Sequence, residues 1–261
     1  MDYKLLIGGE WIETGDWEEV LSPYDRSPVA RVAQGDEGTV DRAVRLAYEA
    51  FREGGLPQYR RAEILDRAAD IVRERRDELA EAICREAGKP IKTARVEAER
   101  TVDTLKFSAT EARKLTGGTV PMEASAGGVG KLGLILRVPY GVVGAISPFN
   151  FPLNLVAHKL GPAIAAGNAV VLKPAGQTPV SSIKLAGILI EAGLPDGWLS
   201  VIPGGGRSVG NAIVEHELTR AITFTGSVPV GWGIAGRVPD KKVCLLYTSP
   251  SPRDGTKDLV C

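Results

Sequence analysis

GVVGAISPFNFPLNLVAHKLGPAIAAGNAVVLKPAGQTP, residues 141–179, is the stretch that decides the fold of this chain. Two apolar runs rich in β-branched residues, 141–146 and 169–173, are separated by a segment of helical length, which predicts a parallel βαβ unit. The first run leads to Asn150, and the second ends at Lys173. The carboxyl ends of parallel strands meet at one edge of a sheet, where open α/β folds bind ligands. We therefore expect both side chains at that edge.

The alternation of strands and helices continues beyond this unit. The apolar runs 199–202 and 221–225 predict two more strands, and 207–215 predicts a helix between them. Thr178 is typical of the N-cap of a helix, which we expect over 179–192. The predicted fold class is therefore α/β, with a parallel, Rossmann-type sheet flanked by helices.

The amino-terminal part is predicted to be a hairpin followed by a helical layer. Two short apolar runs joined by a Gly-Gly pair favour a hairpin within 3–13, and a polar loop follows. Apolar residues then recur at helical spacing over 39–51, 59–87 and about 91–115. GLILRV, residues 133–138, predicts an exposed β arm. We therefore expect three parts: a hairpin and helical layer (1–127), a β arm (128–140) and a βαβ core (141–243).

The composition narrows the classes of function. Of 261 residues, 44% are hydrophobic and 25% are charged, which is ordinary for a globular protein. Because 32 basic residues balance 32 acidic ones, no electrostatic argument favours nucleic acid or an anionic membrane. Polar residues interrupt every long apolar stretch and nothing resembles a signal peptide, so we expect no membrane span and a cytoplasmic location. Cys84, Cys244 and Cys261 have the spacing of neither a disulfide framework nor a metal site, so we expect no metal.

Taken alone, the polar residues at the strand ends have ordinary explanations. Asn150 lies between Pro148 and Pro152, where asparagine commonly forms turns. Lys173 ends a buried run, where a lysine can extend its ammonium group to solvent. PGGGRSVG, residues 203–210, imitates a dinucleotide-binding loop, but such a loop is a weak indication by itself.

Three motifs together are more specific: PFNFP (148–152), AGNAVVLKP (166–174) and FTGS (224–227). In this order and spacing they resemble the aldehyde dehydrogenase superfamily, and the resemblance covers about residues 1–243. It implies an enzyme that oxidises an aldehyde to a carboxylic acid with NAD or NADP, and it makes the βαβ core the cofactor-binding part. Members of this family use a cysteine thiolate, a glutamate base and a nicotinamide cofactor.

The resemblance also assigns roles to individual residues. Asn150 would donate its side-chain N–H to the oxyanion that forms when the thiolate attacks the aldehyde. Lys173 would donate hydrogen bonds to the ribose hydroxyls of the nicotinamide nucleotide. The cofactor-binding residues implied in this way are Ser147, Pro148, Phe149, Lys173, Pro174, Ala175, Gly176, Gly206, Arg207, Gly226 and Ser227.

Position 176 bears on the choice of cofactor. Many NAD-preferring relatives carry a glutamate three residues after the lysine, where it binds the adenosine ribose, but this chain has Gly176. The absence of a carboxylate removes a repulsion from a 2′-phosphate and so permits NADP. Arg207 or Lys184 would then supply a positive charge, and we expect NADP or NAD.

A substrate contact is implied at Arg100, in the helix expected over 91–115. Taken alone it is a solvated charge, but an arginine in this segment reaches the polar or anionic end of short aldehydes in some relatives. The expected substrate is therefore a short polar aldehyde such as lactaldehyde, glyceraldehyde 3-phosphate, sulfoacetaldehyde or a semialdehyde. His158 and Cys84 are expected to be structural.

The part of the family that carries the nucleophilic cysteine and the catalytic glutamate has no match here. Residues 244–261 resemble nothing in the family, so we expect a foreign or disordered segment there, an absent catalytic domain and an inactive chain. The full-length form is expected to be a homo-oligomer. The alternative function is a catalytically inactive nucleotide-binding or interaction module.

Overall fold

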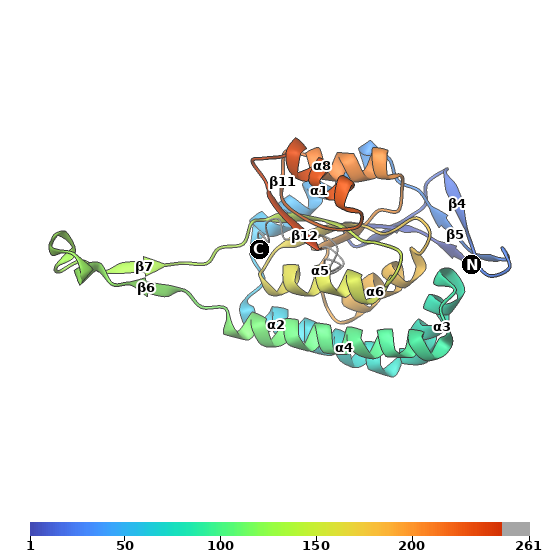
Figure 1. Ribbon diagram of the computed structural model, residues 1–261, viewed down its shortest axis with the longest axis horizontal. Helices are drawn as coiled ribbons and strands as arrows, with labels where there is room; N and C mark the ends of the chain where they lie inside the picture. Colours follow the sequence, from blue (N-terminus) through green and yellow to red (C-terminus); the bar gives the residue numbers. More distant parts are fainter. Residues whose placement is uncertain (247–261) are drawn as a thin grey trace, which may run out of the picture.

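A seven-stranded sheet forms the centre of the computed structural model, which describes residues 1–246 (Figure 1). The strand order is β12-β11-β8-β9-β10-β2-β3. The strands from β12 to β10 run parallel, and the hairpin β2–β3 joins them antiparallel through β10. Their bounds are β2 Leu5–Ile7, β3 Glu10–Ile12, β8 Val142–Ile146, β9 Ala169–Lys173, β10 Leu199–Val201, β11 Thr219–Thr225 and β12 Lys242–Leu246.

The central strands β8 and β9 are almost wholly buried, as their continuous apolar sequences predicted. Their register pairs Ile146 with Lys173, so both strands end at the same level of the sheet. Gly144 in β8 permits close approach of the covering helix. A Cβ atom there would lie 2.6 Å from Cγ2 of Ile213, and a larger residue would push that helix away.

Helices cover both faces of the sheet (Figure 1). The crossover helices α5 (Asn154–Ala165) and α6 (Val180–Glu191) pack on one face. The other face carries α1 (Glu37–Glu53) and α7 (Asn211–Glu215). α8 (Val228–Arg237) packs beside β11. The helix expected over 207–215 is instead a π-helical turn, Gly206–Gly210, followed by the short α7.

A further helical layer lies outside α5 and α6 (Figure 1). It consists of α2 (Gln58–Glu74), α3 (Arg76–Ala87) and α4 (Ile91–Lys114). The single helix expected over 59–87 is wrong, because the helix breaks at Arg75, whose φ of −97° and ψ of 20° are not helical. The guanidinium of Arg75 donates to the carboxylate of Glu191 on α6 at 2.7 and 2.8 Å, and α3 continues from there in contact with α6.

A second, three-stranded sheet was not predicted. Its strands, in the order β1-β5-β4, are β1 Asp2–Tyr3, β4 Trp17–Leu21 and β5 Pro28–Ala33. The sequence over 17–33 was interpreted as a polar loop, because β4 exposes two adjacent glutamates and β5 begins at a proline. Most of the residues of these strands are exposed or partly exposed, and buried residues such as Val20 and Val32 join the core.

The expected β arm is present but begins earlier than residue 128. Strand β6 (Gly118–Val120) pairs antiparallel with β7 (Gly133–Ile135), and two 3₁₀ turns, Met122–Ala124 and Ala126–Gly128, join them. The arm projects far from the rest of the molecule (Figure 1). Its apolar side chains are exposed, including Leu132, Leu134 and Leu136.

The sheet continues past residue 243, where we placed the end of the βαβ core. Strand β12 extends to Leu246 and pairs in parallel with β11 along its whole length, so residues 244–246 belong to the sheet. The expectation of a foreign or disordered segment otherwise falls on 247–261, outside the described residues. Over 1–246, no helix combines the length and the apolar character needed to cross a membrane.

Candidate cofactor and oxyanion site

The candidate site lies at the carboxyl edge of β8 and β9. Two loops leave this edge: residues 147–153 lead from β8 into α5, and residues 174–179 lead from β9 into α6. The backbone amide of Ser147 donates to the carbonyl oxygen of Lys173 at 3.2 Å, so the two loops begin side by side. The structure thus brings together the two strand ends that the sequence predicted to be neighbours.

Asn150 lies in the first loop, partly buried. Its side-chain oxygen Oδ1 is enclosed and has no hydrogen-bond partner, and the same is true of the hydroxyl oxygen of Ser147. Buried polar atoms are nearly always hydrogen-bonded, and exceptions mark functional sites or places where a ligand or water belongs. Two such atoms three residues apart at a sheet edge are consistent with a binding site.

Neutral hydrogen bonds fasten this loop to α6 and to the loop before that helix. The hydroxyl of Ser182 donates to the carbonyl oxygen of Pro152 at 3.2 Å. The hydroxyl of Thr178 donates to the carbonyl oxygen of Phe149 at 3.4 Å. Thr178 is therefore not the helix cap that we expected, since its side chain is directed to the neighbouring loop and the N-cap position of α6 is Pro179.

Lys173 is buried, with 7% of its surface exposed. Its ammonium nitrogen donates to the carbonyl oxygen of Pro174 at 3.1 Å. Burial lowers the pKa of Lys173, and the negative charge of Glu18 on β4 opposes this shift. A Cβ atom on Gly210 would lie 3.5 Å from Cδ of the lysine, which shows that Lys173 packs against the glycine-rich turn. The structure therefore brings Lys173 and the turn Gly206–Gly210 together.

Gly176 and Gly206 both adjoin open space, because a Cβ atom on either would have no neighbour within 4 Å. Gly176 lies with Phe149 and Ala175 in the wall of a groove of about 680 Å³. The lining also includes Glu18 and Glu19 from β4, which the sequence interpretation had placed in a loop. Carboxylates are therefore present in this groove, although position 176 has none. The wall residues are Glu18, Glu19, Val20, Leu21, Pro23, Arg26, Glu86, Ala87, Phe149, Ala175, Gly176, Gln177 and Thr178.

Gly226 and Ser227 join β11 to α8 at the same edge. Since β11 is the other neighbour of β8, their loop lies beside the loop that begins at Ser147. Ser227 is the N-cap of α8, but its side chain makes no capping hydrogen bond. The first amides of a helix lack partners within the helix and suit an anionic group. Arg207 is exposed on the glycine-rich turn.

Arg100 lies on α4, exposed, at the level where α4 crosses the start of α5. The hydroxyl of Thr104, one turn along α4, donates to Oδ1 of Asn154 at 3.0 Å and lies 3.5 Å from Nε2 of His158. Partial burial lowers the pKa of His158, and the positive charges of Arg100 and Lys159 lower it further. Arg100 is thus close to the helix that follows the Asn150 loop.

Buried charged residues near the site were not singled out from the sequence. Lys159 on α5 is 2% exposed, and its ammonium donates to the hydroxyl of Thr225 at 2.6 Å. Burial lowers the pKa of Lys159 to about 7. A lysine inside an otherwise apolar helix was the available indication.

Two buried glutamates of the helical layer were also missed. Glu86, near the end of α3, accepts hydrogen bonds from the amides of Val180 and Ser181 at 2.7 and 2.9 Å, and from the Ser181 hydroxyl. Glu97, on α4, accepts from the amides of Leu153 and Asn154 at 3.0 and 3.2 Å. Each glutamate therefore caps the crossover helix that follows one of the two loops.

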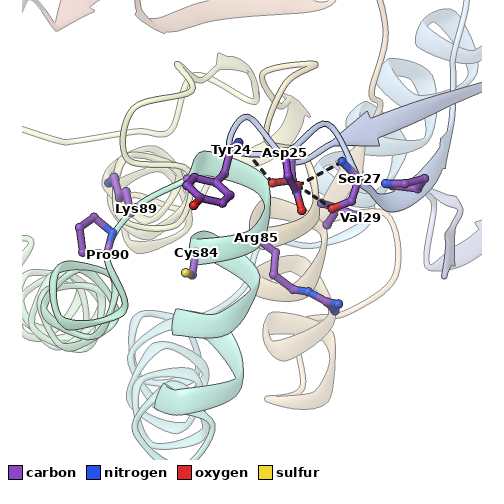
Figure 2. A pocket seen from close by; sticks show the side chains of 11 residues that line it. Tyr24, Asp25, Ser27, Val29, Cys84, Arg85, Lys89 and Pro90 are labelled. Carbon is purple, nitrogen blue, oxygen red and sulfur yellow. Dashed lines mark hydrogen bonds between the residues drawn. The ribbon is translucent and has the colours of Figure 1, made fainter.

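A smaller cavity of about 450 Å³ lies behind this region, between the turn 22–29 and the end of α3 (Figure 2). Lys89 and Pro90 lie on one side of it and Ser27 and Val29 on the other (Figure 2). Asp25 accepts hydrogen bonds from the amide and hydroxyl of Ser27. The carboxylate of Asp25 is thus paired within the turn. Among residues 1–246, no group of three histidine, cysteine or acidic side chains is arranged to hold a metal ion.

Comparison with known proteins gives consistent relatives. The chain is 44% identical over 243 residues to the 3-sulfolactaldehyde dehydrogenase of Priestia megaterium, covering 93% of this chain and 51% of that protein. It is 38% identical over 234 residues to the D-glyceraldehyde dehydrogenase (NADP(+)) of Thermoplasma acidophilum, covering 88% and 47%. The structure of a NAD-dependent benzaldehyde dehydrogenase from Corynebacterium glutamicum superimposes with a TM-score of 0.86 at 38% identity, covering 93% and 53%.

The chain spans about half the length of the curated relatives that it matches. The part of this chain that matches these relatives includes the sheet edge described above. The model of the aldehyde dehydrogenase family matches residues 11–251, which is most of the sequence. The chain therefore belongs to the aldehyde dehydrogenase family.

Proposed function

We propose that this chain is the cofactor-binding half of an NAD(P)-dependent aldehyde dehydrogenase that oxidises a short polar aldehyde to a carboxylic acid. The observation that carries the proposal is the position of Asn150. It lies in a loop held by hydrogen bonds from Thr178 and Ser182, at the sheet edge that also holds Lys173 and the two glycine-containing loops. The full-length enzyme of this proposal contains the part of this chain that matches the family, followed by the half that the relatives have and this chain does not span.

In this proposal the residues of the chain bind and orient the reactants. A bound nicotinamide cofactor supplies the hydride acceptor. Lys173, at the end of β9, would donate hydrogen bonds to the ribose hydroxyls of the cofactor. The backbone amides at the start of α8 would bind its pyrophosphate. Asn150 donates to the oxyanion that forms when a thiolate attacks the aldehyde carbon. One such donor stabilises the transition state by roughly 3 kcal/mol.

The open surface of Gly176 and Gly206 supports cofactor binding, because a bound dinucleotide needs close approach to the backbone there. Its adenosine ribose would face position 176. We propose NADP or NAD as the cofactor. Relatives with each preference have comparable identity to this chain.

The substrate class is proposed from Arg100 and from the relatives. Two of them are dehydrogenases of sulfolactaldehyde and glyceraldehyde, which are short and polar. An exposed guanidinium beside α5 suits the anionic or hydroxylated end of such an aldehyde. Arg100→Leu in the full-length enzyme should raise the KM for an anionic aldehyde about tenfold or more, and leave the KM for a neutral aldehyde of the same length within twofold. Equal changes for both aldehydes would remove Arg100 from the substrate site.

The central test is Asn150→Ala in the full-length enzyme, with reduction of NADP or NAD followed at 340 nm. We expect kcat to fall by about 10²–10³-fold while the Kd of the cofactor stays within twofold, because the lost donor acts on the transition state. An equal loss of cofactor affinity would mean that Asn150 is a structural residue of the loop.

Residues 1–261 alone are proposed to be inactive. Cys84 lies on α3 in the helical layer, and Cys244 lies within β12 rather than at its carboxyl end, so neither is placed to attack an aldehyde beside Asn150. Nicotinamide reduction by the purified chain, abolished by Cys244→Ser, would contradict this. Cofactor binding by a full-length protein that shows no turnover with any aldehyde would favour the inactive nucleotide-binding module.

A further inference from the structure

A buried ion pair lies beneath the loop that carries Asn150. Glu97 is enclosed, with 1% of its surface exposed, and its Oε1 atom accepts hydrogen bonds from the amides of Leu153 and Asn154. Its other oxygen, Oε2, lies 2.5 Å from the ammonium nitrogen of Lys89. The carboxylate therefore joins the first turn of α5 to the connection between α3 and α4.

Lys89 makes a second contact with the same loop. Its ammonium nitrogen lies 3.7 Å from the centroid of the Phe151 ring, well within the range of a cation–π interaction. The side chain of Lys89 is 17% exposed, so this interaction is only weakly screened by solvent. Phe151 is the residue directly after Asn150, and Leu153 follows two residues later.

These contacts act on the part of the loop around Asn150. Pro148 and Pro152 have restricted φ angles, and Phe151 is restricted because it precedes a proline, whereas Phe149 and Asn150 keep their ordinary backbone freedom. The hydroxyls of Thr178 and Ser182 hold backbone oxygens on the side of α6. Among the contacts of this loop that the structure describes, the Lys89–Glu97 pair supplies the charged ones, and it acts on both the ring and the backbone that follow Asn150.

The opposite end of α5 provides a comparison. The guanidinium of Arg61, from α2, donates to the carbonyl oxygen of Ala165 at 2.8 Å, and Arg61 is 8% exposed. Both ends of α5 are therefore held by a buried charged side chain of the helical layer. Only the end held by Glu97 adjoins Asn150, because the helix spans twelve residues, about 18 Å, between the two contacts.

We propose that Lys89 and Glu97 are positioning residues for Asn150. The pair orients the loop so that the amide of Asn150 is directed to the place where the oxyanion forms. This inference rests on the proposed function, since it assumes that Asn150 is the oxyanion donor. It adds to that proposal a specific dependence of turnover on two residues of the helical layer that contact neither substrate nor cofactor.

The test uses the full-length enzyme with Lys89→Met, Glu97→Gln and, as the matched control, Arg61→Met. We expect Lys89→Met and Glu97→Gln to lower kcat about tenfold or more, because small displacements of a catalytic group are costly, while the KM for NADP stays within twofold. Arg61→Met should lower the Tm by at least as much as Lys89→Met or Glu97→Gln lowers it, and should leave kcat within twofold of wild type. Lys89→Arg keeps the positive charge and should restore most of the turnover.

Double variants separate positioning from general stability. In the Asn150→Ala background, Lys89→Met should lower kcat less than twofold, because the group that it positions is gone. If the fold-decrease in kcat of the double variant equals the product of the two single fold-decreases, the proposal is overturned. A fall in kcat with Arg61→Met as large as that with Lys89→Met would overturn it too. If Asn150→Ala leaves kcat unchanged, it is the proposed function of Asn150 that fails.

A measurement on residues 1–261 needs no activity. Amide hydrogen exchange of Leu153 and Asn154 should become about tenfold faster or more in Glu97→Gln, while exchange of Ala157, whose amide donates within the helix to Leu153, should change less than threefold. Unchanged exchange at Leu153 and Asn154 would show that Glu97 does not hold the loop. This result stands whether or not the enzyme proposal is correct.

Discussion

The sheet edge and the β arm differ in how completely each is built from this chain. At the edge, buried glutamates of α3 and α4 cap the helices that follow both loops, and the hydroxyls of Thr178 and Ser182 hold the loop of Asn150. In the arm, β6 and β7 pair only with each other, and Leu132 and Leu136 are about four-fifths exposed. The arm therefore leaves a row of apolar side chains without a covering element among residues 1–246. The edge is therefore preorganised within the chain, while the arm has a surface suited to a partner.

The largest effect expected on the edge concerns Glu86. Burial raises the pKa of this carboxyl group to about 7 in the folded chain, against its ordinary value of 4.5, and the hydrogen bonds from Ser181 and Val180 oppose the rise. Between these two pH values the folded state holds more protons than the unfolded state, so the free energy of unfolding falls as the pH rises. The stabilisation is complete below about pH 4.5 and is lost as the pH passes about 7, a change on the order of 3 kcal/mol.

Urea unfolding of residues 1–261 from pH 4 to pH 8 checks this expectation. Glu86→Gln should remove that part of the pH dependence, since glutamine does not titrate. Glu78→Gln, an exposed position on the same helix, serves as the control and should keep it. An identical pH profile in wild type and Glu86→Gln would show that the edge does not depend on this carboxyl group.

These results also show what the sequence could and could not predict. Strands β8 and β9 were predicted almost to the residue, because a strand buried on both faces is continuously apolar. Strands β4 and β5 were missed, because a short strand with two adjacent exposed glutamates resembles a loop. The break at Arg75 was missed because no glycine or proline marks it. Tertiary contact with α6 accounts for it.

The candidate site was also predicted only in part, because local sequence patterns show some of its residues and not others. The motifs located Asn150 and Lys173, since Lys173 ends a recognisable strand and Asn150 lies in the loop after another. Glu86 and Glu97 were missed because their partners lie 94 and 56 residues further along the chain. Spacing within one helix does not show which loop of another element will meet it.

A smaller effect is expected at the cofactor groove. Gly176→Glu in the full-length enzyme should shift the ratio of kcat/KM for NAD over NADP in favour of NAD by about 1–3 kcal/mol. The new carboxylate repels a 2′-phosphate and accepts hydrogen bonds from a free ribose. Both cofactors should be compared at one ionic strength, because salt screens exposed charges. Gly176→Gln is the uncharged control. An unchanged ratio would mean that position 176 does not face the adenosine ribose.

The smallest effect is expected in the arm. Leu134 is 63% exposed, so Leu134→Ala should change the free energy of unfolding of residues 1–261 by less than about 0.5 kcal/mol. Leu105 on α4 is fully buried, and Leu105→Ala should cost about 2–5 kcal/mol. Unfolding by urea at low protein concentration measures both. A loss of 2 kcal/mol or more with Leu134→Ala would show that the arm packs against the same chain.

The long sequence separation of the glutamate contacts has a consequence for the order of folding. Helices α2, α3 and α4 are close in sequence and contact one another extensively, so they can associate early. The amides that Glu86 and Glu97 cap belong to helices α6 and α5, which lie far along the chain. Closing these distant contacts costs loop entropy that is recovered only when the sheet is already in place. We expect the two loops of the candidate site to be among the last segments of the chain to become ordered.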